Sequence, residues 1–155
     1  MRDRIRRPKD LEKVLERLKD DDRIFETKQK GMMFAAALGY SLFKEKVDSS
    51  EIESYGEGIK MMYFQKPQDE GFIDALSVAK SNDLKSLDPE MQEERVELFE
   101  KCAFLGLKEM QKHCYDDRPA DPILGILTLI DRMRKSQSDD LPGLDNVAEE
   151  VGEYF

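Results

Sequence analysis

Apolar residues recur at helical spacing along most of the chain. After Pro8, leucine and valine residues follow at spacings of three and four, which predicts an amphipathic helix from Pro8 to about Lys19. The stretch GMMFAAALGYSLF is apolar on nearly every side and predicts a central helix that starts after Thr27 and ends near Lys46. Its alanines and Gly39 would let another helix pack closely, and a self-association face is the alternative interpretation.

Two Asp-Pro pairs, Asp88-Pro89 and Asp121-Pro122, predict the starts of two later helices. Aspartate is favoured at the N-cap of a helix, and proline is favoured in its first turn. Further helices are predicted at 68–79, 88–114, 121–135 and 146–154, with a loop at SQSDDLPG. The segment VDSSEIESYGEGIK has the composition of a loop, and IKMMYF after it could be a strand or the start of a turn.

These elements predict an all-α fold: a compact, bundle-like domain of five or six helices, with one short strand or hairpin allowed near 59–64. At 155 residues the chain fits a single helical domain, 1–155, in which 1–7 form a basic N-terminal arm.

Composition narrows the class of protein. Hydrophobic residues make up 39% and charged residues 38%, typical of a folded, well-solvated domain rather than a disordered chain. No apolar run approaches the ~20 residues that cross a bilayer, so we expect a cytoplasmic protein without a membrane partner.

Few residues are suited to catalysis or metal binding. His113 is the only histidine, which excludes a metal site or proton relay built on two imidazoles. Cys102 and Cys114 would lie ~18 Å apart on one helix, too far for a disulfide, so both are expected to be free thiols in the core. The sequence predicts no enzyme activity, no metal site and no cofactor.

The N-terminal ten residues carry a net charge of +3, whereas the whole chain carries −9. If residues 2–6 were extended, three arginines would share one face and Ile5 the other, as in a strand that enters a DNA groove. The candidate DNA-binding residues are Arg2, Arg4, Arg6, Arg7 and Lys9. A solvated, inactive N-terminus is the alternative interpretation.

A second group of residues could bind a protein partner. The candidates lie in a segment near two glycines and are Met61, Met62, Tyr63 and Phe64. Methionine and aromatic side chains are common at protein interfaces, although burial of the group in the core is the simpler interpretation.

Several stretches together resemble a known family. RIRRPKDLEKVLERL, the turn at 25–28, MFAAALGY and DPILGILTLIDRM are similar to the dnd system-associated protein 4 family, encoded beside bacterial and archaeal DNA phosphorothioation genes. The similarity is strongest over 4–46 and weaker over 120–135. The resemblance implies an accessory role in a defence system that marks DNA with sulfur and restricts unmarked DNA, and it brings no catalytic residues.

Two functions follow as hypotheses. The first is a non-enzymatic adaptor that binds a protein partner in a DNA-modification or restriction complex. The alternative is a DNA-binding module that uses the basic arm, as a homodimer resembling ribbon-helix-helix proteins. The salt dependence of DNA binding separates these two hypotheses. If the arm makes about five phosphate contacts, a plot of log affinity for DNA against log salt concentration has a slope near −4.

Overall fold

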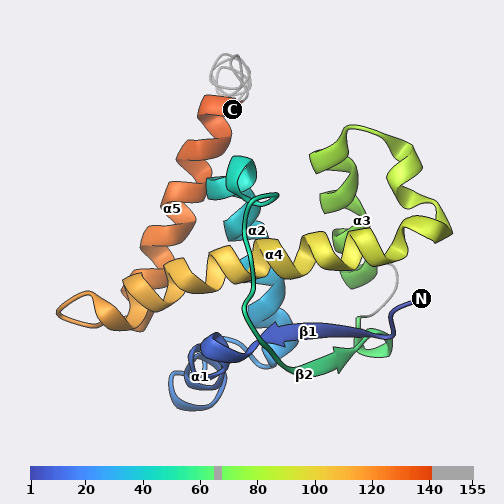
Figure 1. Ribbon diagram of the computed structural model, residues 1–155. Coiled ribbons are helices and arrows are strands. Elements are labelled where there is room, and N and C mark those ends of the chain that lie inside the picture. Colours follow the sequence, from blue (N-terminus) through green and yellow to red (C-terminus); the bar gives the residue numbers. More distant parts are fainter. Residues whose placement is uncertain (65–67, 141–155) are drawn as a thin grey trace.

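The computed structural model describes residues 1–64 and 68–140 of the chain (Figure 1). Within these residues its helices are α1 (Glu12–Glu16), α2 (Lys28–Phe43), α3 (Gln68–Ser81), α4 (Gln92–Gln111) and α5 (Pro122–Asp140). Two strands, β1 (Arg4–Pro8) and β2 (Tyr55–Lys60), form a small antiparallel sheet. The mostly-α fold with one short hairpin-like sheet is confirmed.

The centre of the molecule is the crossing of α2 and α4, which Figure 1 shows with α2 behind α4. A Cβ atom on Gly39 would lie 1.9 Å from the carbonyl oxygen of Cys102, and one on Gly106 would lie 1.8 Å from that of Ala35. The two helices therefore touch backbone to backbone, which only glycine permits. The small face of α2 packs against α4 in the same chain.

Capping residues set two of the predicted helix starts, whereas the start predicted at Asp88 is wrong: Asp88 makes no side-chain capping bond, and a 3₁₀ turn (Pro89–Met91) precedes α4. The Thr27 hydroxyl accepts a hydrogen bond from the Lys30 backbone N–H at 3.1 Å, and an Asp121 carboxylate oxygen accepts one from Leu124 at 3.1 Å. These bonds satisfy backbone donors that the first helical turn leaves free.

Residues 55–58 of β2 were predicted as a loop, and this prediction is wrong, whereas 59 and 60 lie in the segment where a short strand was allowed. Its residues pair with β1, with Ile5 opposite Ile59 and Arg6 opposite Gly58. A Cβ atom on Gly58 would lie 2.9 Å from the Cβ of Arg4, so the glycine provides room for a close strand neighbour. The segment Met61–Tyr63 is a 3₁₀ turn rather than part of a strand.

Two predicted boundaries also move. Pro8 ends β1, and the first helical region starts one residue later, with a 3₁₀ turn (Lys9–Leu11) before α1 and a π turn (Arg17–Asp21) after it. The loop predicted at SQSDDLPG is wrong as far as Asp140, because α5 continues to that residue. The Ser136 hydroxyl donates to the Ser41 carbonyl at 2.8 Å and holds this part of α5 against the end of α2. The helix predicted at 146–154 lies outside the described residues.

The core fills the space around α4. Among the described residues, its largest fully buried apolar side chains come from most of the chain and are Ile5, Leu15, Leu18, Met32, Leu38, Val47, Phe64, Phe99, Leu107, Met110 and Leu129. Phe64 and Phe72 both meet Phe99 edge to face, at centroid distances of 6.0 and 6.3 Å. Among the described helices, none has the length and apolar content needed to cross a membrane.

Candidate functional site

The basic N-terminal arm is built into the fold by one buried carboxylate. Glu100, on α4, has no solvent-exposed surface. It accepts hydrogen bonds from the Arg2 guanidinium at 2.8 Å, from the Arg6 guanidinium at 3.1 Å and from the Arg6 backbone N–H at 2.6 Å. The arm therefore neutralises a charge that would be costly to bury alone.

Neighbouring groups strengthen this attachment. The Gln92 side chain exchanges two hydrogen bonds with the backbone of Arg2, at 3.0 and 2.9 Å. The Arg6 guanidinium lies 3.7 Å from the centre of the Tyr55 ring, within range of a cation–π contact. The hydrogen bond to Glu100 raises the pKa of Arg6, while burial raises the pKa of Tyr55.

The remaining candidate DNA-binding residues differ in exposure. Arg7 is buried, and its Nε lies 2.8 Å from a Glu12 carboxylate oxygen, an ion pair without the alignment of a hydrogen bond. Arg4 is exposed and reaches only the Gly58 carbonyl, at 3.4 Å. Lys9 is exposed. Among the five candidates, only Arg4 and Lys9 thus have their charged groups turned to solvent without an acidic partner in the described residues.

The strand β1 takes its partner from the same chain. One edge pairs with β2, and the Arg6 N–H on the other side is bound by Glu100. A ribbon-helix-helix protein instead pairs this strand with that of a second copy. The pairing of β1 within its own chain therefore does not support the ribbon-helix-helix alternative.

The candidate partner-binding residues are split between core and surface. Phe64 is buried and Met61 packs against the core, whereas Met62 and Tyr63 are 76% and 58% exposed. The 3₁₀ turn that carries them is held at both ends: the Met61 N–H donates to the Asp3 carbonyl at 2.8 Å, and Phe64 packs on Phe99.

The histidine and the two cysteines are held in structural contacts. His113 has a Glu109 carboxylate oxygen 3.3 Å from one ring nitrogen and an Asp117 oxygen 3.6 Å from the other. Cys102 and Cys114 are free and buried, and burial raises the pKa of their thiols to about 12 and about 11. No group of three or more potential metal ligands occurs in the part of the chain that the structure describes.

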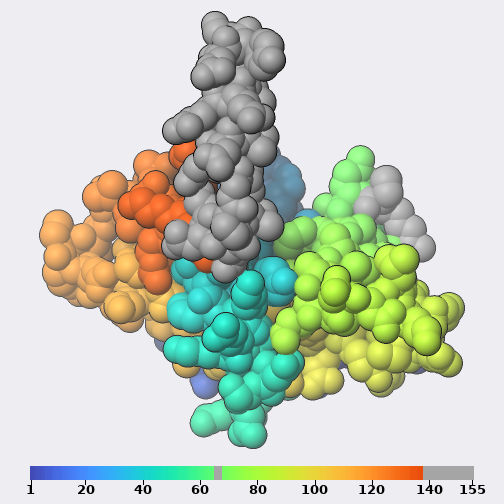
Figure 2. All heavy atoms as spheres, turned by 90° about the horizontal axis from the view of Figure 1, so that it is seen from above, coloured from blue at the N-terminus to red at the C-terminus, as the bar shows by residue number. Residues whose placement is uncertain are grey.

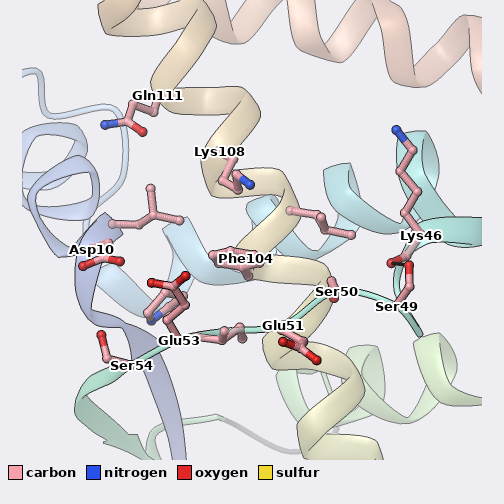
Figure 3. Close-up of a pocket in the computed structure, with 14 residues that line it drawn as sticks. Asp10, Lys46, Ser49, Ser50, Glu51, Glu53, Ser54, Phe104, Lys108 and Gln111 are labelled. Carbon is pink, nitrogen blue, oxygen red and sulfur yellow. Dashed lines mark hydrogen bonds between the residues drawn. The ribbon is translucent and has the colours of Figure 1, made fainter.

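A groove of about 730 Å³ lies between α4 and the segment 49–54 that precedes β2 (Figure 3). Leu11, Phe104 and Leu105 supply apolar surface. Charged side chains of both signs stand around them: Asp10, Glu51, Glu53, Lys46 and Lys108. The groove is lined by apolar side chains and by charges of both signs, so its lining does not indicate a particular class of ligand.

Sequence reasoning missed Glu100, the residue that organises the arm. A signal was available, because Glu100 lies four residues after Val96 and three before Ala103, on the apolar stripe of its helix. A carboxylate at a core position predicts a cationic partner. The arginines of the arm are such cations. Their pairing with Glu100 was not predicted, because more than ninety residues separate the two in the sequence.

Comparison with known proteins identifies a family. No curated protein and no solved structure matches the chain. The family model for DNA sulphur modification system-associated protein 4 matches residues 4–145, which include residues 4–7 of the arm, the α2–α4 crossing and α5. This chain therefore belongs to the DNA sulphur modification system-associated protein 4 family.

Proposed function

We propose that this protein is a non-enzymatic adaptor of a DNA sulphur modification system and that it acts through contacts with other proteins of the system. Family membership supports the link to the system. The observation that carries the adaptor role is the exposed pair Met62 and Tyr63, presented on a turn that the core anchors.

The anchoring matters because a contact surface binds more tightly when its backbone is already ordered. The buried Phe64 and the Met61–Asp3 hydrogen bond fix the turn, so the two exposed side chains lose little freedom on binding. Tyrosine and methionine are enriched at interfaces, since each combines a large apolar area with a polar or polarisable group.

The state of the thiols supports a role without nucleophilic catalysis. A cysteine attacks as its thiolate, and both thiols here have raised pKa values and lie inside the core. The DNA-binding alternative gains no support from the arm, since Arg2, Arg6 and Arg7 already pair with acidic side chains of the same chain.

The test is co-purification of the full chain with the other proteins of its DNA sulphur modification system, after nuclease treatment. Replacing Met62 and Tyr63 by glutamate should abolish co-purification without lowering the melting temperature. Leu84→Glu with Leu87→Glu is the matched control, because both leucines are exposed elsewhere on the surface. Equal binding by both double variants, or no binding by the unmodified protein, would contradict the proposal.

A further inference from the structure

One edge of the small sheet is open. In the described part of the chain the sheet consists of β1 and β2, and Figure 1 shows β1 between β2 and α4, so no described strand lies beyond β2. Helix α5, orange in Figure 2, lies on the upper side of the molecule, whereas the sheet lies at the bottom of Figure 1. An open edge presents unpaired backbone groups, to which a further strand can bind.

The backbone at this edge is oriented for pairing. In an antiparallel ladder, opposite residues alternately bond to each other and point away from each other. The Arg6 N–H is bound by Glu100 on the α4 side of β1, so Gly58, opposite Arg6, turns its N–H and C=O to the outer edge of β2. Lys60 lies two residues later and has the same orientation. Among the described residues, only the Arg4 guanidinium reaches these groups, at the Gly58 carbonyl and at 3.4 Å.

Two cations meet at the same edge. Arg4 lies directly opposite Lys60, and both residues are exposed. The Arg4 side chain runs past Gly58, which brings its guanidinium to the outer side of β2. Like charges at opposite positions destabilise a sheet. Neither cation has an acidic partner among the residues that the structure describes, so a bound anion would stabilise the pair.

The neighbouring carboxylates do not neutralise these cations. Glu57 pairs with Arg7 at 3.4 Å, and Asp3 points to the other face of the sheet, because side chains alternate along the chain. The nearest acids of α4 lie on the other side of β1, and each pairs with a different cation: Glu93, Glu97 and Glu100. The outer edge of β2 is therefore positively charged.

We propose that the outer edge of β2 binds an extended, acidic segment of the partner protein as a third strand, an inference that rests on the proposed adaptor function. The segment pairs with the outward backbone groups of Gly58 and Lys60. Opposite residues of neighbouring strands share a face, so an acidic side chain opposite Lys60 meets both cations. An edge lysine hinders pairing with other strands, which makes the acidic residue a condition for binding.

The edge continues into the exposed pair that carries the adaptor proposal. Met62 and Tyr63 follow Lys60 by two and three residues, on the turn after β2. A segment that pairs with Lys60 therefore lies next to this turn. The strand edge supplies orientation and charge recognition, and the two exposed side chains supply the apolar contact area that a short strand lacks.

Lys60→Pro separates strand pairing from a contact through charge alone. Lys60 has a φ of −62°, which proline adopts, and Ile59 before it is extended. The lost N–H points outward, so the sheet keeps its internal bonds and the variant should keep the melting temperature. Lys60→Gln is the matched control, because it removes the same charge and keeps the N–H.

The test titrates the chain with the system protein that co-purifies with it, after nuclease treatment. Lys60→Gln should weaken binding about threefold, and Lys60→Pro should weaken it about tenfold further. Equal binding by the two variants would overturn strand pairing, whereas the adaptor role would stand if Met62→Glu with Tyr63→Glu abolishes binding. Failure of every system protein to co-purify would overturn both.

Hydrogen exchange of the unmodified chain gives a second readout. In the complex, the amides of Gly58 and Lys60 should exchange at least tenfold more slowly than in the free chain, and unchanged exchange would overturn the proposal. Labelled duplex DNA at about 50 mM salt tests the other anionic ligand. If Lys60→Gln weakens DNA binding and leaves binding of the system protein unchanged, the edge binds phosphate and the proposal is wrong.

Discussion

Arg6 donates three hydrogen bonds to Glu100, one through its backbone N–H at 2.6 Å and two through its guanidinium at 3.2 and 3.1 Å. Arg6 therefore attaches the backbone of β1 to α4 and also pairs its own charge with a carboxylate of that helix. This contact accounts for most of the basic charge of the arm, because Arg2, Arg6 and Arg7 face acidic groups of the same chain.

Replacing Glu100 by glutamine should destabilise the fold by about 3 kcal/mol, because it leaves the Arg2 and Arg6 guanidinium groups without their anionic partner. Urea unfolding followed by circular dichroism measures the change. Glu94→Gln, an exposed position on the same helix, is the control and should differ little from the unmodified protein. Equal unfolding midpoints for the two variants would show that the buried carboxylate does not hold the arm.

The α2–α4 crossing predicts a sharp difference between two glycines. Gly106→Ala should cost about 3 kcal/mol or more, since its methyl group would overlap the Ala35 carbonyl. Gly71→Ala should be neutral or stabilising by up to about 1 kcal/mol, because nothing lies within 4 Å and alanine favours the helix. Thermal melts of the two variants give the comparison, and similar melting temperatures would refute the close backbone contact.

The buried thiols predict a loss of stability in alkali. Burial raises the pKa of Cys102 and Cys114 from 9.0 to about 12 and about 11, so the folded state holds both protons more tightly than the unfolded state. Below pH 9 both states are protonated and this stabilisation is fully present. As the pH rises from 9 towards 11 and 12, the unfolded thiols ionise first and the folded state loses stability.

Between pH 8 and 10 the two thiols together should lower the free energy of unfolding by about 3 kcal/mol. Urea titrations under reducing conditions at both pH values measure this loss. The double variant Cys102→Ala with Cys114→Ala should retain only the pH dependence that comes from other groups, including Tyr115, whose pKa burial also raises. If the double variant shows the full pH dependence of the unmodified protein, the two thiols do not cause the loss of stability.

Local signals in the sequence predicted much of the helical architecture. Thr27 and Asp121 cap the helices that they were expected to start, because capping depends only on residues within one turn. The apolar, small-residue stretch correctly predicted a central helix with a close neighbour. In each case the deciding residues are close together in the chain.

Long-range pairing could not be predicted in the same way. Tyr55–Lys60 contains two glycines and reads as a turn, and it becomes a strand only because β1 is beside it. The arm was expected to be either a DNA-binding segment or a solvated, inactive N-terminus. Its actual environment depends on Glu100, which lies on another element far along the chain.

Titration of labelled duplex DNA with the full chain, at about 50 and 200 mM salt, most directly separates protein adaptor from DNA-binding module. Deleting residues 1–7 would remove the core residue Ile5, so Arg4→Ala with Lys9→Ala is the cleaner variant. Because Arg4 and Lys9 are the only candidate residues of the arm without an acidic partner in the described part of the chain, we expect weak binding, with a slope of log affinity against log salt no steeper than about −2. A slope near −4 that this variant weakens would contradict the adaptor proposal and identify the arm as a DNA-binding element.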